Sequence, residues 1–182
     1  MTQRVACFTG RFQPFHNQHL EVLSALGHKF DLIIIGVTNP DIANLQEHSA
    51  SQHRHTDAAN PFSYESRVKI INDSISELSE LKGAEVKVIP FDLTAPESWQ
   101  VPANTVFALR IFSPWEASKL ALFSDLGFEV MELLAPENKL SASDIRASLA
   151  ANDNTWESLV AQGAISTIRN EWNSTIDVKA SA

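Results

Sequence analysis

The chain has 182 residues, 44% of them hydrophobic, and a formal net charge of −8 at pH 7. A chain of this length builds one well-buried core but is short for two, so we predict a single domain spanning residues 1–182. Nucleic acids and anionic membranes are bound by basic surfaces, and the acidic balance argues against both as partners. The one cysteine cannot form an intramolecular disulfide, and neither a signal peptide nor a membrane-spanning run is apparent. We therefore expect a cytoplasmic protein.

Short apolar segments alternate with longer amphipathic ones along the chain. The short segments are rich in β-branched and aromatic residues, and several are apolar at successive positions, which is typical of strands buried on both faces. We expect strands at 4–9, 31–37, 85–91, 105–112 and 128–134.

The longer segments carry apolar residues at helical spacing. We expect helices at 18–29, 63–78 and 114–127, with Ser63 capping the second and Gly127 ending the third. From Ser143 to about Trp172 the sequence predicts two or three short helices, packed through Trp156, Leu159, Val160, Ile165 and Ile168.

This alternation predicts an α/β fold: a Rossmann-like, doubly wound parallel sheet of about five strands, with helices on both faces and a short helical C-terminal tail. Ligands of such sheets bind at the carboxyl ends of the strands. Residues 38–62 interrupt the pattern with a long segment of little periodicity that contains three histidines. Since long loops inside compact domains are usually functional or disordered, we interpret this inserted loop as a lid, the alternative being a mobile surface insertion.

The stretch "FTGRFQPFHNQHLEVL", residues 8–23, leads from the first strand into the first helix. Gly10 would let the backbone approach a phosphate, and Arg11 could reach its oxygens. His16 and His19 lie at the helix start, where unpaired N–H groups and the helix dipole favour anions. Two imidazoles there suit the charge that develops in phosphoryl-type transfer. The alternatives are a zinc site, which lacks a third ligand, and a pair that only caps and packs the helix.

"GRFQPFHNQHL" resembles the G-R-F-Q-P-F-H-x-G-H-L signature of HxGH-type nucleotidyltransferases, the cytidylyltransferase-like superfamily, and in particular that of archaeal-type nicotinamide mononucleotide (NMN) adenylyltransferases. The one departure is Gln18, which stands where the family has glycine. The resemblance implies catalytic roles for His16 and His19, and nucleotide binding by Gly10, Arg11, Phe12, Gln13 and Gln18.

A second stretch, "LSASDIRASL", is similar to the S-x-T-x-I-R signature of the same family, with serine in place of threonine. The resemblance implies that Ser141, Ser143 and Arg146 bind the triphosphate and that Arg146 also serves catalysis. The alternative is an ordinary helix start with Ser143 as its cap. "AISTIRN" further on has one residue too few between Thr167 and Arg169, and we interpret it as plain helix.

The resemblance continues between and after these motifs. "HTDAANPFSYESR", residues 55–67, is similar to the family's H-T-x-x-N-P-F-T-x-x-E-R, with one added residue and with Ser66 in place of glutamate. "WESLVAQGAISTI" resembles the family's W-E-x-L-V-P ending. Similarity thus touches most of the chain, and it makes His55 a candidate contact of the acceptor.

The acceptor pocket is where the sequence departs from the adenylyltransferases. The family's S-G-N-type loop is replaced by "ALRIFSPWEASK", which offers two cations and an aromatic face. The candidate acceptor-binding residues are Arg110, Trp115, Lys119 and, by a loose alignment with a family tryptophan, Trp99. The alternatives are a surface ion pair for Arg110 and simple packing for Trp99.

The resemblance implies transfer of a nucleoside monophosphate from a triphosphate to a small phosphate or phosphonate acceptor, with release of pyrophosphate. The chain is most similar to the NMN adenylyltransferases, whose substrates are ATP and NMN. The altered acceptor pocket favours an alternative, a CTP-dependent enzyme that acts on a small phosphonate. A further alternative is not an enzyme but a catalytically inactive protein of the same fold that binds a nucleotide. Mg²⁺ is expected with the triphosphate and not in a protein-built metal site, because no carboxylate cage is visible. The expected partners are small molecules, and a homo-oligomer is left open.

Overall fold

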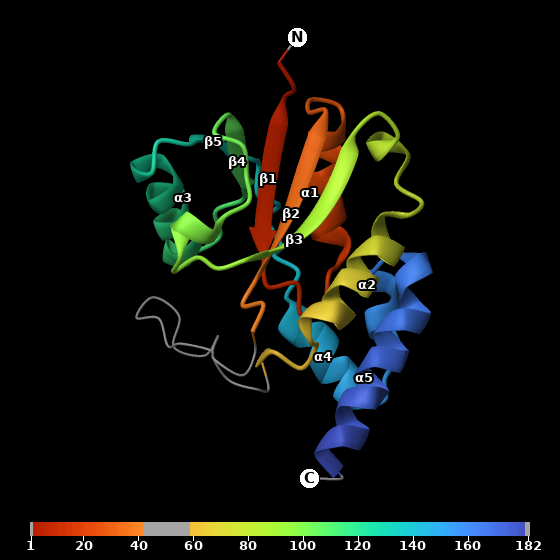
Figure 1. The fold of residues 1–182 in the computed structure, drawn as a ribbon. Coiled ribbons are helices and arrows are strands. Elements are labelled where there is room, and N and C mark those ends of the chain that lie inside the picture. The colour runs from red at the N-terminus through yellow and green to blue at the C-terminus, as the bar shows by residue number, and fades with distance from the viewer. Residues whose placement is uncertain (1, 42–58, 181–182) are drawn as a thin grey trace.

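The computed structural model describes residues 2–41 and 59–180, the last four of these by their backbone alone. Five strands form one parallel sheet in the order β3-β2-β1-β4-β5, as Figure 1 shows. The strands are β1 (Val5–Gly10), β2 (Leu32–Thr38), β3 (Glu85–Phe91), β4 (Thr105–Leu109) and β5 (Glu129–Glu132). The chain adds β2 and β3 on one side of β1 and then β4 and β5 on the other. The predicted Rossmann-like sheet is therefore confirmed.

The three central strands owe their position to continuous apolar sequence. Residues of β2 and β4 are buried throughout, and β1 is buried up to its last residue, Gly10. The edge strand β3 instead alternates between more and less exposed residues and carries the charged Glu85 and Lys87 on its exposed positions. The central strands are thus buried on both faces, whereas the edge strand is partly exposed, as expected for a parallel sheet.

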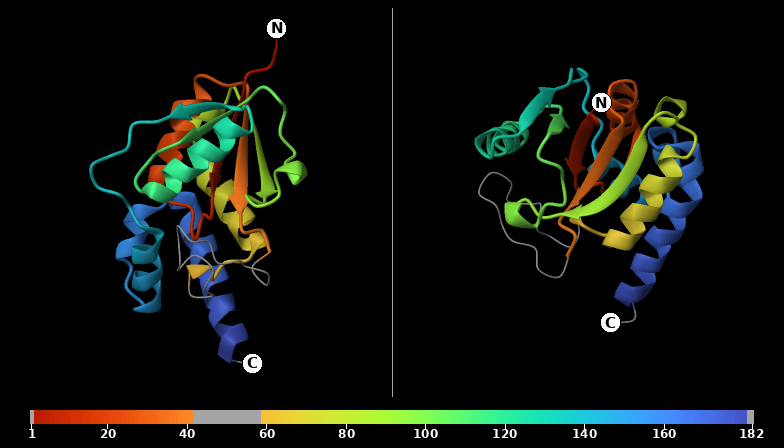
Figure 2. Two further views of the ribbon diagram at one scale, coloured as in Figure 1. Left: turned by 90° about the vertical axis from the view of Figure 1, so that its left-hand side faces the viewer. Right: turned by 45° about the horizontal axis from the view of Figure 1, so that its top comes forward.

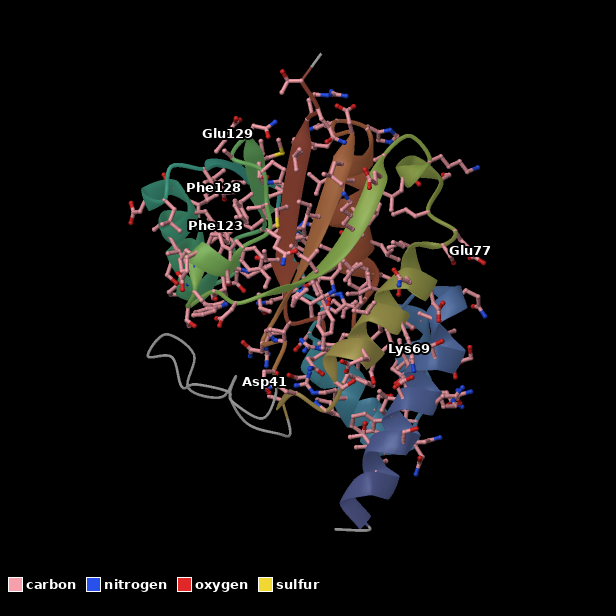
Figure 3. The ribbon with its side chains drawn as sticks, viewed as in Figure 1. Asp41, Lys69, Glu77, Phe123, Phe128 and Glu129 are labelled. Atoms are coloured by element: carbon pink, nitrogen blue, oxygen red, sulfur yellow. The ribbon has the colours of Figure 1, made fainter. Side chains whose placement is uncertain are left out.

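Within the described residues, five α-helices cover the two faces of the sheet, and Figure 2 shows α3 on one side and the α2–α5 pair on the other. One core cluster joins the sheet to α1 (Asn17–Gly27), α2 (Tyr64–Ile75), α4 (Ala142–Ala150) and α5 (Ile165–Ala180). The other cluster lies under α3 (Pro114–Asp125), where Phe123 and Phe128 are found in Figure 3. Side chains alternate across β1, so Ala6 and Phe8 belong to the first cluster and Val5 and Cys7 to the second.

The expected helix ends agree with the structure in two places and differ in one. The Ser63 hydroxyl accepts the N–H of Ser66 at 3.1 Å and caps α2, and Gly127 follows α3 with a left-handed φ of 87°. At α4 the cap is Ser141, not Ser143, because the Ser141 Oγ accepts the N–H of Ser143 at 3.2 Å. The helix begins at Ala142, two residues earlier than a Ser143 cap would allow.

The C-terminal part is less fragmented than the sequence suggested. After α4 and two 3₁₀ turns (Thr155–Leu159 and Gln162–Ala164), α5 continues for 16 residues. Its length is explained by packing along α2, where Glu171 accepts hydrogen bonds from Lys69 at 2.8 Å and from Ser66 at 2.5 Å. Thr167 and Arg169 lie in this helix, as the spacing of "AISTIRN" indicated.

Two further expectations concern the inserted loop and membrane-spanning helices. Most of the proposed lid falls at 42–58, which lies outside them. Among the helices that are described, none is both long enough and apolar enough to cross a membrane.

Candidate active site

A cavity of about 310 Å³ opens at the carboxyl ends of β1 and β4. It lies where the strand order reverses, between the strands added to one side of β1 and those added to the other. This switch point is the usual ligand site of a doubly wound sheet. The cavity wall comes from the β1–α1 turn, the first turn of α1, the segment after β4, α3, and the start of α4.

The β1–α1 turn is shaped by aromatic packing. Phe12 takes a left-handed φ of 52° and buries its ring against Phe8 and Phe15, with ring centroids 5.4 and 5.2 Å away. A Cβ on Gly10 would lie 2.6 Å from Cε1 of Phe12. Gly10 is thus required by the ring that folds back over it, a reason that differs from the phosphate approach expected from sequence. Phe12 shapes the cavity from behind, since its side chain is buried.

His16 and His19 form a stacked pair at the cavity floor. Their ring centroids are 3.6 Å apart with an angle of 21° between the planes. The backbone N–H of His16 donates to Nδ1 of His19 at 3.1 Å. Because Nδ1 accepts this hydrogen bond, the proton of neutral His19 resides on Nε2. The first turn of α1 therefore fixes which nitrogen of His19 can donate to a ligand.

Burial favours the uncharged form of both imidazoles. It lowers the pKa of His16 to about 4, helped slightly by the positive charge of Lys139. Burial also lowers the pKa of His19 well below its ordinary value, and His16, Arg110 and Lys139 act in the same direction. An anion bound beside the pair would reverse this balance, because opposite charge nearby favours the protonated imidazole. The pair is thus arranged to respond to negative charge.

Arg67 organises the loop that carries Arg11, although sequence analysis gave it no role. It is fully buried and donates to four carbonyl oxygens: those of Arg11 at 3.0 Å, Thr38 at 2.7 Å, Asn39 at 2.7 Å and Ser63 at 3.2 Å. Burial lowers the pKa of Arg67 to about 10, so it stays charged at neutral pH. It joins the ends of β1 and β2 beside the cavity. The only sequence signal was a charged residue on the buried face of an amphipathic helix.

Gln13, which the resemblance implies binds the nucleotide, also has a structural function in the β1–α1 turn. Its side-chain Nε2 donates to the carbonyl of Phe62 at 2.9 Å, and its Oε1 accepts the N–H of Phe62 at 2.9 Å. The amide thus mimics a strand partner for the segment before α2. Gln13 contributes to the cavity wall and, through its carbonyl, holds Arg146.

The second motif lies beside the first, as the resemblance implied. Arg146 donates through Nη1 to the carbonyl of Gln13 at 2.6 Å and through Nη2 to Oγ of Ser143 at 3.0 Å. Ser141, Ser143 and Arg146 all line the cavity. The N-termini of α1 and α4 therefore open on the same space, and both favour anions there.

Arg110 and Lys119 lie on the acceptor side of the cavity. Arg110 Nη1 donates to Glu21 Oε2 at 2.9 Å and to the carbonyl of Gln18 at 3.1 Å, so the ion pair considered from sequence exists. Its side chain is nevertheless only 14% exposed, and its Nε is buried with no hydrogen-bond partner among the described residues. Lys119 is 8% exposed and donates to the carbonyl of Thr9 at 3.1 Å. Trp115 also lines this side.

One expected acceptor residue, Trp99, lies outside the cavity, and another, His55, cannot be placed. Trp99 stacks on Phe91 with ring centroids 4.5 Å apart, and its indole N–H donates to the carbonyl of Asp92 at 2.6 Å. It belongs to the core cluster under α3, which agrees with the packing alternative. His55 lies outside the described residues.

Lys139 is a cavity residue that sequence analysis missed. Its Nζ lies 4.8 Å from the ring centroid of Phe112 and 3.5 Å from Oε1 of Glu116. Nothing in the local sequence "APENKLS" distinguishes it from a surface lysine. Of the described residues that line the cavity, five are lysine or arginine and Glu116 alone is acidic. The cavity is therefore strongly basic in a chain whose net charge is −8.

Comparison with known proteins supports this geometry. Residues 7–148 match the family described as cytidylyltransferase-like. The chain belongs to the cytidylyltransferase-like family. It is 28% identical over 154 residues to phosphonoformate cytidylyltransferase of Streptomyces viridochromogenes, covering 83% of each chain. It is 30% identical over 168 residues to nicotinamide-nucleotide adenylyltransferase of Methanospirillum hungatei, covering 90% of this chain and 86% of the relative.

The fold has also been seen in solved structures. A bifunctional NMN adenylyltransferase/ADP ribose pyrophosphatase of Francisella tularensis, complexed with AMP and a manganese ion, superposes with a TM-score of 0.60 at 15% identity. The superposition covers 97% of this chain and 50% of that longer one. Together with the family match, these likenesses make the chain a nucleotidyltransferase, as the two motifs indicated.

Proposed function

We propose that this nucleotidyltransferase transfers CMP from CTP to a small phosphonate or phosphate acceptor, releasing pyrophosphate. The observation that carries the choice of acceptor is the basic acceptor side, where Arg110 has a buried Nε without a hydrogen-bond partner among the described residues. A compact dianion can satisfy this donor and be attracted by Lys119, whose side chain is also buried. The Streptomyces relative, named for phosphonoformate, supports the same choice.

Transfer of AMP from ATP to NMN is the second candidate, favoured by the Methanospirillum relative. The nicotinamide ring of NMN is positively charged and would meet the cations of Arg110 and Lys119 unfavourably. Trp99, the residue aligned with an aromatic platform for that ring, packs against Phe91 away from the cavity. Both features support the small anionic acceptor over NMN.

The site supports a direct, in-line reaction. An acceptor oxygen attacks the α-phosphorus, a new P–O bond forms, and the bond to the bridging oxygen of the β-phosphate breaks as pyrophosphate leaves. His19 donates from Nε2 to a non-bridging oxygen of the α-phosphate, and His16 lies stacked beside it. Arg146, Ser143 and the N-terminus of α4 bind the β- and γ-phosphates. Positioning and charge neutralisation then carry the reaction without a covalent enzyme intermediate.

A divalent metal ion, which we propose to be Mg²⁺, accompanies the triphosphate. Among the described residues, no group of three or more histidine, cysteine, aspartate or glutamate side chains could hold a metal. The chain therefore fits an ion that is bound mainly by phosphate oxygens and water, which is common for Mg²⁺. The ion would neutralise charge on the phosphates while the basic side chains of the cavity hold them.

The test is a pyrophosphate-release assay with ATP, CTP, GTP and UTP against phosphonate, phosphate and NMN acceptors. We expect CTP with a small phosphonate to give the highest kcat/KM. Arg110→Ala should raise the KM of that acceptor by roughly tenfold or more and leave the KM of the triphosphate nearly unchanged.

The matched control is Arg4→Ala, which also removes one arginine from an ion pair, with Asp31 at the opposite end of β1. It should leave both KM values as they are. Efficient turnover of NMN with ATP that is insensitive to Arg110→Ala would reject the small-acceptor proposal in favour of the adenylyltransferase.

A further inference from the structure

Gln18 joins three segments that surround the cavity. Its side-chain Nε2 donates to the carbonyl of Asn138 at 2.6 Å, and its Oε1 accepts the N–H of Leu140 at 2.8 Å. Its own backbone carbonyl accepts Nη1 of Arg110 at 3.1 Å. The first turn of α1 is thus tied both to the linker that leads into α4 and to the segment that follows β4.

The linker, residues 138–140, is held from its other side as well. Lys139 lies over the ring of Phe112 and pairs with Glu116 at the start of α3. Residues 139 and 140 line the cavity directly before Ser141, the cap of α4. A displacement of the linker would therefore also displace the cavity wall and Ser141, the first residue of the second motif.

The amide of Gln18 faces the linker. Because both of its ends are bonded to the linker backbone, Gln18 can act on a ligand through the position of the linker and through its own bulk. The two helix N-termini that attract phosphates lie on either side of this bridge. In the proposed reaction, a nucleotide whose phosphates lie at these N-termini has Gln18, Lys139 and Leu140 available to contact its ribose and base, because all three line the cavity.

We propose that Gln18 is a specificity-determining positioning residue, which holds the linker close to α1 and thereby favours a pyrimidine over a purine nucleotide. The inference rests on the proposed nucleotidyl transfer. A glycine at this position would remove both linker hydrogen bonds and leave the volume of a glutamine side chain open to the cavity. A purine base, which is larger than a pyrimidine, would then bind with a smaller free-energy penalty.

Two variants separate bulk from hydrogen bonding. Gln18→Gly removes both, whereas Gln18→Met keeps an unbranched side chain of similar length and removes only the hydrogen bonds. Asn17→Ala is the matched control, since Asn17 is the neighbouring residue of the same turn and donates instead to the carbonyl of Ser158 at 3.0 Å. Neither Asn17 nor Ser158 lines the cavity.

The first readout is amide hydrogen exchange at Leu140, which needs no substrate. Both Gln18 variants should exchange this amide roughly tenfold faster than the wild type, because its acceptor is lost. Asn17→Ala should leave it unchanged. Equal exchange in the wild type and both Gln18 variants would overturn the bracing role, whatever the enzyme's activity.

The second readout is the ratio of kcat/KM for CTP to that for ATP. Gln18→Gly should lower the ratio about tenfold or more, chiefly through KM, as expected when a pocket loses a size constraint. Gln18→Met should raise KM for both nucleotides and keep the ratio within about threefold of the wild type. An unchanged ratio in an active Gln18→Gly enzyme would overturn the proposal. A wild type that releases no pyrophosphate with any triphosphate would instead contradict the proposed function.

Discussion

Acid should destabilise this protein through His16 at pH values where most carboxylates are still ionised. His16 is 5% exposed, and burial lowers its pKa from 6.5 to about 4. In the unfolded chain the imidazole binds a proton as the pH falls below about 6.5, whereas in the folded protein it stays neutral until the pH is much lower. The stabilising effect of the neutral form is therefore complete above pH 6.5 and is lost as the pH falls towards 4.

The magnitude follows from the two pKa values. At pH 7 neither state binds much proton, so the contribution of His16 to the pH dependence is small. At pH 5 the unfolded imidazole is almost fully protonated and the folded one is not, which lowers the free energy of unfolding by roughly 2 kcal/mol. His19 acts in the same direction, because burial lowers its pKa too.

The assay is urea denaturation at pH 7 and pH 5 of the wild type, of His16→Gln and of His28→Gln. His28 follows the last turn of α1 on the surface and serves as the matched histidine control. The loss of stability between the two pH values should be about 2 kcal/mol smaller in His16→Gln than in the wild type. If the wild type and His16→Gln lose the same free energy, His16 is not held neutral by the fold.

Two further variants test the roles proposed for the motifs. His19→Ala should lower kcat by about two orders of magnitude, equivalent to roughly 3 kcal/mol, with little change in nucleotide affinity; an unchanged kcat in steady-state assays would remove the pair from the mechanism, and His28→Ala is its control. Arg146→Ala should weaken binding of the triphosphate much more than of the monophosphate in calorimetric titrations, while Arg169→Ala should change neither. Equal losses for both nucleotides in Arg146→Ala would place that arginine away from the β- and γ-phosphates.

The sheet was predictable because its signal is local. The apolar run of β2 and the alternation of strands with amphipathic helices follow from burial on both faces, which any window of the sequence displays. The two motifs could also be located, since each combines a strand end or helix start with residues suited to phosphate. Their convergence on one cavity is what the structure adds.

The residues that were missed act over long sequence separations. The sequence around Arg67 does not indicate its function. Arg67 acts by donating to the carbonyls of Arg11 and Asn39, which lie 56 and 28 positions away in the chain. Gln18 was visible as a departure from the family, but its partner Asn138 lies 120 positions along the chain. In the sequence Lys139 resembles a surface lysine, and its ion pair with Glu116 is visible only in the structure. No short window contains these pairings, so periodicity and motif spacing cannot reveal them.

The distribution of charge explains how an acidic nucleotidyltransferase can bind a polyanionic nucleotide. The negative charges lie largely on exposed positions, such as Glu129 and Glu132 of β5, where water and salt screen them. The lysines and arginines of the cavity instead lie beside buried imidazoles and aromatic rings, where the local dielectric is lower and each charge acts over a longer range. Glu21 and Glu116 restrain two of these cations through ion pairs with Arg110 and Lys139. Each ion pair limits repulsion within the cluster, and its cation can exchange the carboxylate for a stronger contact with a phosphate.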